Sequence, residues 1–68
     1  MNELDTVALL QDLPEHSLKR GQVGAIVAIL DTALGVYEVE FVGNDGRTYA
    51  MLTLTQDQLM LLHYEPTT

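Results

Sequence analysis

The most regular pattern in the chain is the alternation of apolar and acidic residues in VYEVEFV, residues 36–42. Successive side chains of a strand point to opposite faces. Tyr37, Val39 and Phe41 therefore share one face, and the glutamates between them share the other. This period of two predicts a strand with its apolar face toward the core and its two glutamates outward.

The segments beside this strand predict its partners in a sheet. GNDGR provides a turn over Asn44–Gly46, since asparagine, aspartate and glycine tolerate the left-handed backbone of tight turns. TYAMLTL, residues 48–54, is then the returning strand of an antiparallel hairpin. Upstream, the apolar run AIVAIL, residues 25–30, is typical of a strand buried on both faces.

Weaker patterns complete the order of elements. DTVALLQ, residues 5–11, favours a strand, with a single helical turn as the alternative. DLPEHS, residues 12–17, favours a loop because of its proline. Thr55 followed by Gln58 is a capping-box pattern that predicts one helical turn. MLLHY, residues 60–64, predicts a last short strand.

Together these elements predict an all-β fold, a five-stranded SH3-like small barrel with one helical turn before the last strand. Sixty-eight residues suffice for a single domain, so residues 1–68 are expected to form one barrel with a frayed tail at residues 65–68. A chain this short buries only about 60% of the surface that its unfolded state exposes. The free energy of unfolding of the isolated chain is therefore expected to be small.

Glycines mark the expected turns, and we assign Gly21, Gly24 and Gly46 as structural turn residues. Lys19 and Arg20 stand side by side directly before Gly21. A phosphate contact is one interpretation of this basic pair, and a solvated tight turn ahead of a buried strand is the other. The acidity of the chain as a whole favours the turn.

Composition limits the possible partners. Ten acidic residues against three basic ones give a formal net charge of −7, which disfavours nucleic acid because phosphate binding depends on lysine and arginine. The chain has no cysteine, which excludes disulfides and thiolate metal sites. The N-terminal segment has no basic stretch followed by an apolar one, and the longest apolar run has six residues. We expect a cytoplasmic protein with no membrane partner.

Several stretches resemble known small barrels. LKRGQVGAIVAI resembles the diverging turn and second strand of SH3-like barrels, and residues 18–46 resemble the KOW motif. Nearly the whole chain, from LLQDLPEHS through YEVEFVGNDGRTYAMLTLTQDQLMLL, is similar to a bacterial family of short SH3-like proteins known only as a domain of unknown function. The resemblance implies the barrel fold and a protein partner encoded nearby, since some members stand beside a small toxin. It implies no catalytic residues.

The chain departs from the better-known relatives at the residues that bind their ligands. ALLQDL stands where peptide-binding SH3 domains carry an aromatic ALYDY segment, and tryptophan is absent. The stacking platform for a polyproline ligand is therefore missing. Nucleic-acid-binding KOW domains are basic, whereas this chain is acidic.

Candidate chemistry is sparse. Glu38 and Glu40 lie on one strand face, where two carboxylates could act as acid and base or hold a hard cation together with His16 or His63. The alternative is a polar outer face that keeps the strand soluble. No recognised metal-ligand spacing is present, and Ser17 beside His16 has no orienting acid. We expect no enzyme, no cofactor and no bound metal.

The strongest functional signal is a surplus of apolar residues. Several strands carry apolar side chains on both faces, although one small barrel has a single interior. We therefore expect a homo-oligomer, with Leu10, Leu52, Leu54 or Leu62 at the contact. The expected function is a non-enzymatic protein-interaction module, the neutralising partner of a small bacterial toxin. The alternative is a small metal-binding or enzymatic subunit that uses the two glutamates and a histidine.

Overall fold

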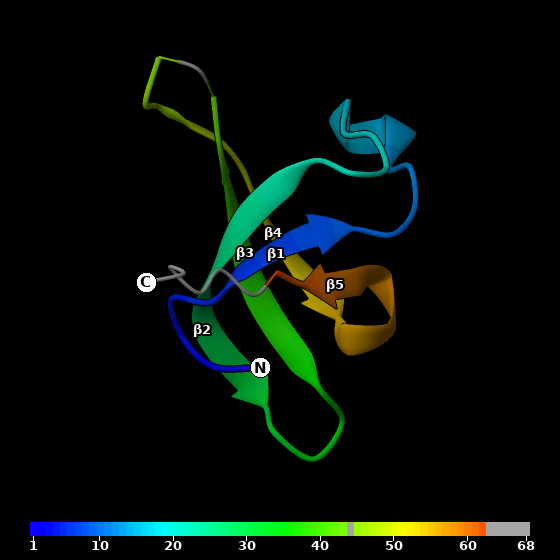
Figure 1. The fold of residues 1–68 in the computed structure, drawn as a ribbon, viewed down its shortest axis with the longest axis vertical. Coiled ribbons are helices and arrows are strands. Elements are labelled where there is room, and N and C mark those ends of the chain that lie inside the picture. Colours follow the sequence, from blue (N-terminus) through cyan, green and yellow to red (C-terminus); the bar gives the residue numbers. More distant parts are fainter. Residues whose placement is uncertain (44, 63–68) are drawn as a thin grey trace, which may run out of the picture.

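Five antiparallel strands form one sheet in the computed structural model of the chain, which describes residues 1–43 and 45–62 (Figure 1). The strand order across the sheet is β4-β3-β2-β1-β5. The strands are β1 (Thr6–Leu9), β2 (Val23–Asp31), β3 (Val36–Val42), β4 (Thr48–Thr55) and β5 (Leu59–Leu61). Two 3-10 turns, η1 (Pro14–His16) and η2 (Gln56–Gln58), are the helical elements of the described residues. The all-β expectation is confirmed.

The strand with the clearest sequence pattern has the predicted bounds. β3 covers residues 36–42, and β4 extends the predicted returning strand by one residue. β2 begins two residues earlier than the apolar run that predicted it, and β1 is shorter than predicted. β5 is a strand of three residues. The predictions for Asn44, for residues 63–64 and for the tail at residues 65–68 lie outside the described residues.

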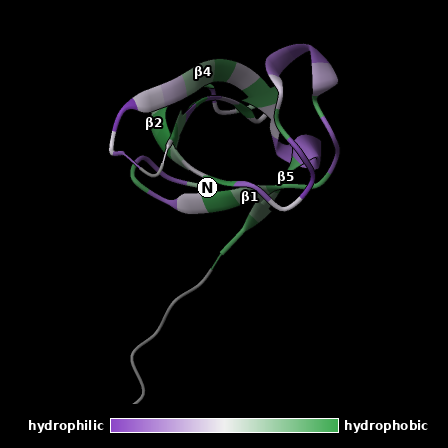
Figure 2. Ribbon diagram, turned by 90° about the horizontal axis from the view of Figure 1, so that it is seen from above, coloured by the Kyte–Doolittle hydropathy of each residue, from purple (hydrophilic) through white to green (hydrophobic). Residues whose placement is uncertain are grey.

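The core lies on the inner face of the curved sheet. Figure 2 shows how the sheet bends, so that β4 lies across from β1 and β5. Tyr37, Val39 and Phe41 are buried, as the alternation in β3 predicts. The segment between β1 and β2 adds Leu13 and Leu18, which bridge to each other and pack into the same core. Among residues 1–43 and 45–62, the buried cluster consists of Val7, Leu9, Leu13, Leu18, Ile26, Tyr37, Val39, Phe41, Leu54 and Leu59.

The three glycines assigned to turns have two different roles. Gly21 and Gly46 have φ angles of 92° and 80°, the left-handed backbone that the sequence predicts. The assignment of Gly24 to a turn is wrong, because Gly24 lies within β2. A Cβ atom there would lie 2.8 Å from both the Phe41 ring and the carbonyl oxygen of Glu40. Glycine at this position therefore provides space for close packing between β2 and β3.

Both helical turns have local causes. The capping box predicted for η2 is present, with the Thr55 backbone N–H donating to Oε1 of Gln58 at 2.9 Å. η1 lies inside a segment predicted as loop. Pro14 stands at its start, where the missing N–H costs nothing, and Ser17 ends it in the left-handed region. No helix within residues 1–43 and 45–62 has the length and apolar character needed to cross a membrane.

Candidate interaction surface

Strand register places apolar side chains side by side on the outer face of the sheet. Ala8 pairs with Met60 on β5 and with Val23 on β2, so these three residues form a row across three strands. Met60 and Val23 are about half exposed, whereas Ala8 between them is 4% exposed. The register therefore places apolar residues next to one another across β5, β1 and β2.

A second row crosses the same face two residues further along. Thr6 pairs with Ala25, Ala25 with Glu40, and Glu40 with Met51, which connects β1, β2, β3 and β4. Glu40 is therefore the acidic member of an otherwise uncharged row. We use the name outer face for the two rows together with Val42, that is, for Thr6, Ala8, Val23, Ala25, Glu40, Val42, Met51 and Met60.

The large apolar side chains of the outer face are well exposed. Val23 and Val42 are each 52% exposed, Met51 is 50% and Met60 is 48%. The interface residues predicted from the sequence do not include these four, although Met51 and Met60 belong to the apolar surplus noted there, and a signal for Val42 was available. Val42 occupies the side of β3 that otherwise carries glutamates, so it breaks the polar alternation of that face.

A shallow hollow lies within the outer face. It has a volume of 240 Å³ and is lined by Thr6, Val23, Gly24, Ala25, Glu40 and Val42. Its walls therefore come from three neighbouring strands, and Glu40 supplies the one charged side chain among them. The three strands that line the hollow are held in register by the pairing of β1 with β2 and of β2 with β3.

The two glutamates are half-buried and bind neighbouring threonines. Thr48 Oγ1 donates to Oε2 of Glu40 at 2.8 Å, and Thr53 Oγ1 donates to Oε2 of Glu38 at 3.3 Å. Both threonines lie on β4, so these hydrogen bonds link the outer side of β3 to the sheet edge. The outward orientation predicted for the glutamates agrees with these contacts.

Within residues 1–43 and 45–62, the structure does not assemble the carboxylate and histidine cluster of the alternative hypothesis. Among the described residues, no group of three or more histidine, aspartate or glutamate side chains could hold a metal ion. His16 lies exposed in η1, on the segment between β1 and β2. His63 lies outside the described residues.

The leucines predicted at an interface differ in exposure. Leu54 is 4% exposed and belongs to the core, so its assignment to a contact is wrong. It lies opposite Tyr37 in the sheet, and this register turns its side chain inward. Leu52 is partly buried against the same core. Leu10 is 43% exposed and Leu62 is half-buried, and both flank Met60 at the β1–β5 end of the sheet.

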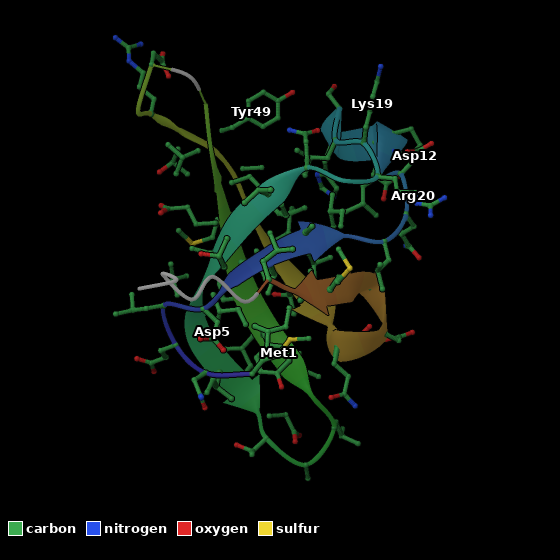
Figure 3. The ribbon with its side chains drawn as sticks, viewed as in Figure 1. Met1, Asp5, Asp12, Lys19, Arg20 and Tyr49 are labelled. Carbon is green, nitrogen blue, oxygen red and sulfur yellow. The ribbon has the colours of Figure 1, made fainter. Side chains whose placement is uncertain are left out.

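The basic pair lies in the turn before β2, at the far end of the segment that carries η1 (Figure 3). The Arg20 backbone N–H donates to Oδ1 of Asp12 at 2.8 Å, and that of Lys19 donates to Oε1 of Gln22 at 2.8 Å. The Tyr49 ring reaches toward this segment, and its hydroxyl donates to the Ser17 carbonyl oxygen at 3.2 Å (Figure 3). The backbone contacts of the pair are those of a closed turn.

These features describe a small all-β domain with an acidic, partly apolar sheet face. The chain belongs to the family described as Domain of unknown function (DUF4926), whose model matches residues 3–61. The resemblance to a family of unknown function is thereby confirmed. No curated protein and no solved structure matches the chain.

Proposed function

We propose that the protein is a non-enzymatic interaction module whose outer face binds a basic protein. The observation that carries the proposal is the exposure of Val23, Val42, Met51 and Met60 on one continuous sheet face. Exposed apolar side chains gathered on one face are typical of contact surfaces. The formal net charge of −7 favours a cationic partner, because complementary potentials speed association and disfavour acidic competitors.

The proposal includes closure of the sheet as an SH3-like barrel. Three observations support it: the strand order, the curvature of the sheet, and the 3-10 turn directly before β5 (Figure 2). Closure would cover the inner face, so the outer face alone would remain for contacts. A small toxin is the partner class that the family resemblance implies, and the absence of cysteine supports a cytosolic location.

Self-association is the second part of the proposal. Leu10, Met60 and Leu62 form an apolar strip along β1 and β5. A chain of 68 residues without a disulfide gains stability when such a strip is covered. We propose that a second copy covers this strip, including Met60, and that the remaining outer face, with the hollow lined by Val23 and Val42, stays available for the basic partner.

Affinity capture from the native host, read by mass spectrometry, tests the interaction. The wild-type protein is compared with Val42→Lys, which places a charge of the same sign as the partner on the outer face. Leu34→Lys is the matched control, because Leu34 is 70% exposed in the turn between β2 and β3, outside that face. We expect a basic protein that is retained by the wild type and the control and lost with Val42→Lys. Equal retention by all three would contradict the proposal.

A further inference from the structure

The hollow on the outer face has the size of one side chain. Its 240 Å³ lies below the range of about 300–1,000 Å³ typical of small-molecule sites. It is open to solvent and lined mainly by the apolar groups of Val23, Ala25 and Val42. A cofactor or metabolite would thus find little enclosure there, whereas a protruding side chain of a bound protein would fill it.

One wall of the hollow carries a carboxylate without a cationic partner. The single ion pair within residues 1–43 and 45–62 joins Arg47 to Asp45, so Glu40 forms none there. Thr48 donates one hydrogen bond to Oε2 of Glu40. This bond holds the carboxylate in place and leaves Oε1 without a hydrogen-bond partner in the described structure. The hollow therefore combines an apolar floor with a fixed negative charge at its side.

The geometry points to a binding site for a lysine or arginine side chain of the partner protein, with its methylene groups on Val23 and Val42 and its cation at Glu40. This inference rests on the proposed function and names the chemistry that the outer face recognises. Long basic side chains bury their aliphatic stems on apolar surface while the charged end finds a carboxylate. The hollow offers both surfaces, because Val23, Val42 and Glu40 all line it.

The charge of the protein selects this occupant over the alternatives. Phosphates and acidic peptides would meet Glu40 within a chain of net charge −7. A second copy carries the same net charge and has three basic residues to offer, of which Arg47 already pairs with Asp45. A basic segment of another protein satisfies the apolar and the charged part of the site together.

Titration of the isotope-labelled protein with a blocked pentapeptide, a central lysine flanked by valines, tests the site. The backbone amide signals of Val23, Ala25 and Val42 are the readout. We expect these signals to shift saturably, and to shift less when norleucine replaces the lysine. Raising the salt concentration to about 1 M should also weaken binding, because it shortens the screening length to about 3 Å.

A pair of charge-neutralising variants provides the control. Glu40→Gln keeps an oxygen that can accept from Thr48 and removes the charge, and should weaken peptide binding about threefold, as expected for an exposed ion pair. Glu38→Gln makes the same change on the same strand outside the hollow and should leave binding unchanged. Equal weakening by both variants, or no shift at the hollow, would overturn the inference.

Two further outcomes separate this inference from the proposed function. If the same amide signals move with protein concentration alone, a second copy fills the hollow and the inference is wrong. If a basic protein from the host is lost with Val42→Lys but retained equally by Glu40→Gln, the interaction module stands and the assignment of the cation to Glu40 is wrong. Loss of the protein with both variants, and retention by Glu38→Gln, supports both.

Discussion

Both faces of this sheet carry apolar side chains, which are buried on the inner face and exposed on the outer face. β3 shows the contrast within one strand, because Val39 is fully buried and Val42 is 52% exposed. Val39 belongs to the buried core cluster, whereas Val42 lines an open hollow. Apolar character alone therefore does not distinguish a buried core residue from an exposed outer residue in this chain. The register of each strand does.

This comparison explains why the chain is more apolar than one small core requires. Inward residues such as Leu9, Ile26 and Phe41 bury almost all of their surface. Outward residues such as Val23 and Met60 keep about half of theirs exposed. Contact with another molecule would bury this surface, and the proposed function rests on that expectation.

A matched pair of substitutions gives the largest expected difference between the faces. Val39→Ala removes two buried methyl groups and should lower the free energy of unfolding by about 2–3 kcal/mol. Val42→Ala makes the same change on the outer face and should alter it by less than about 0.5 kcal/mol. Urea unfolding followed by circular dichroism measures both. Equal losses would show that Val42 also belongs to the core.

Gly24→Ala tests the close approach of β2 and β3. The added Cβ would lie 2.8 Å from the Phe41 ring and from the Glu40 carbonyl oxygen, so the strands must separate. We expect a loss of about 2 kcal/mol, within the range for overpacked sites. Ala25→Gly, on the opposite face of the same strand, should cost about 1 kcal/mol or less because it creates no clash. A stable Gly24→Ala variant would contradict the packing role.

Gly21 and Gly46 should respond differently, because a Cβ at either position meets nothing within 4 Å. Their positive φ angles are the constraint, and valine there should cost about 1–2 kcal/mol. In a 68-residue domain, with a total stability of about 3–10 kcal/mol, this is a large share. Thermal unfolding of Gly21→Val and Gly46→Val measures the loss. Unchanged midpoints in both variants would show that neither backbone is constrained.

The contrast between the faces also shows how far the sequence predicts this structure. Local patterns were sufficient for β3, where the alternation runs through the whole strand, and for the Thr55–Gln58 capping box, whose hydrogen bonds join neighbours in sequence. Gly24 and Leu54 could not be assigned locally. Their roles depend on Phe41 and Tyr37, which lie on another strand. The hollow likewise requires the register of three strands, which no single segment specifies.

Self-association should depend on the apolar strip of Leu10, Met60 and Leu62 along β1 and β5. We expect light scattering at tens of micromolar to report a dimer or larger oligomer, and Leu10→Glu to dissociate it. Because folding and assembly are linked, the unfolding midpoint of the wild type should rise with protein concentration and that of the variant should not. Leu34→Glu, in the exposed β2–β3 turn, is the control and should behave as wild type. A stable wild-type monomer would show that this strip is not a contact between two copies.

We expect the protein not to bind nucleic acid, although the chain contains two adjacent basic residues. Lys19 and Arg20 lie in the turn before β2, and Arg47 lies in the β3–β4 connection with Asp45 3.7 Å away. Three cations on two separate loops, against ten acidic residues, cannot release enough counterions to hold a phosphate backbone. We expect no retention of labelled RNA or duplex DNA at micromolar protein and physiological salt. A salt-sensitive gel shift that is lost in the double variant Lys19→Ala and Arg20→Ala would contradict this expectation. It would show that this turn binds nucleic acid.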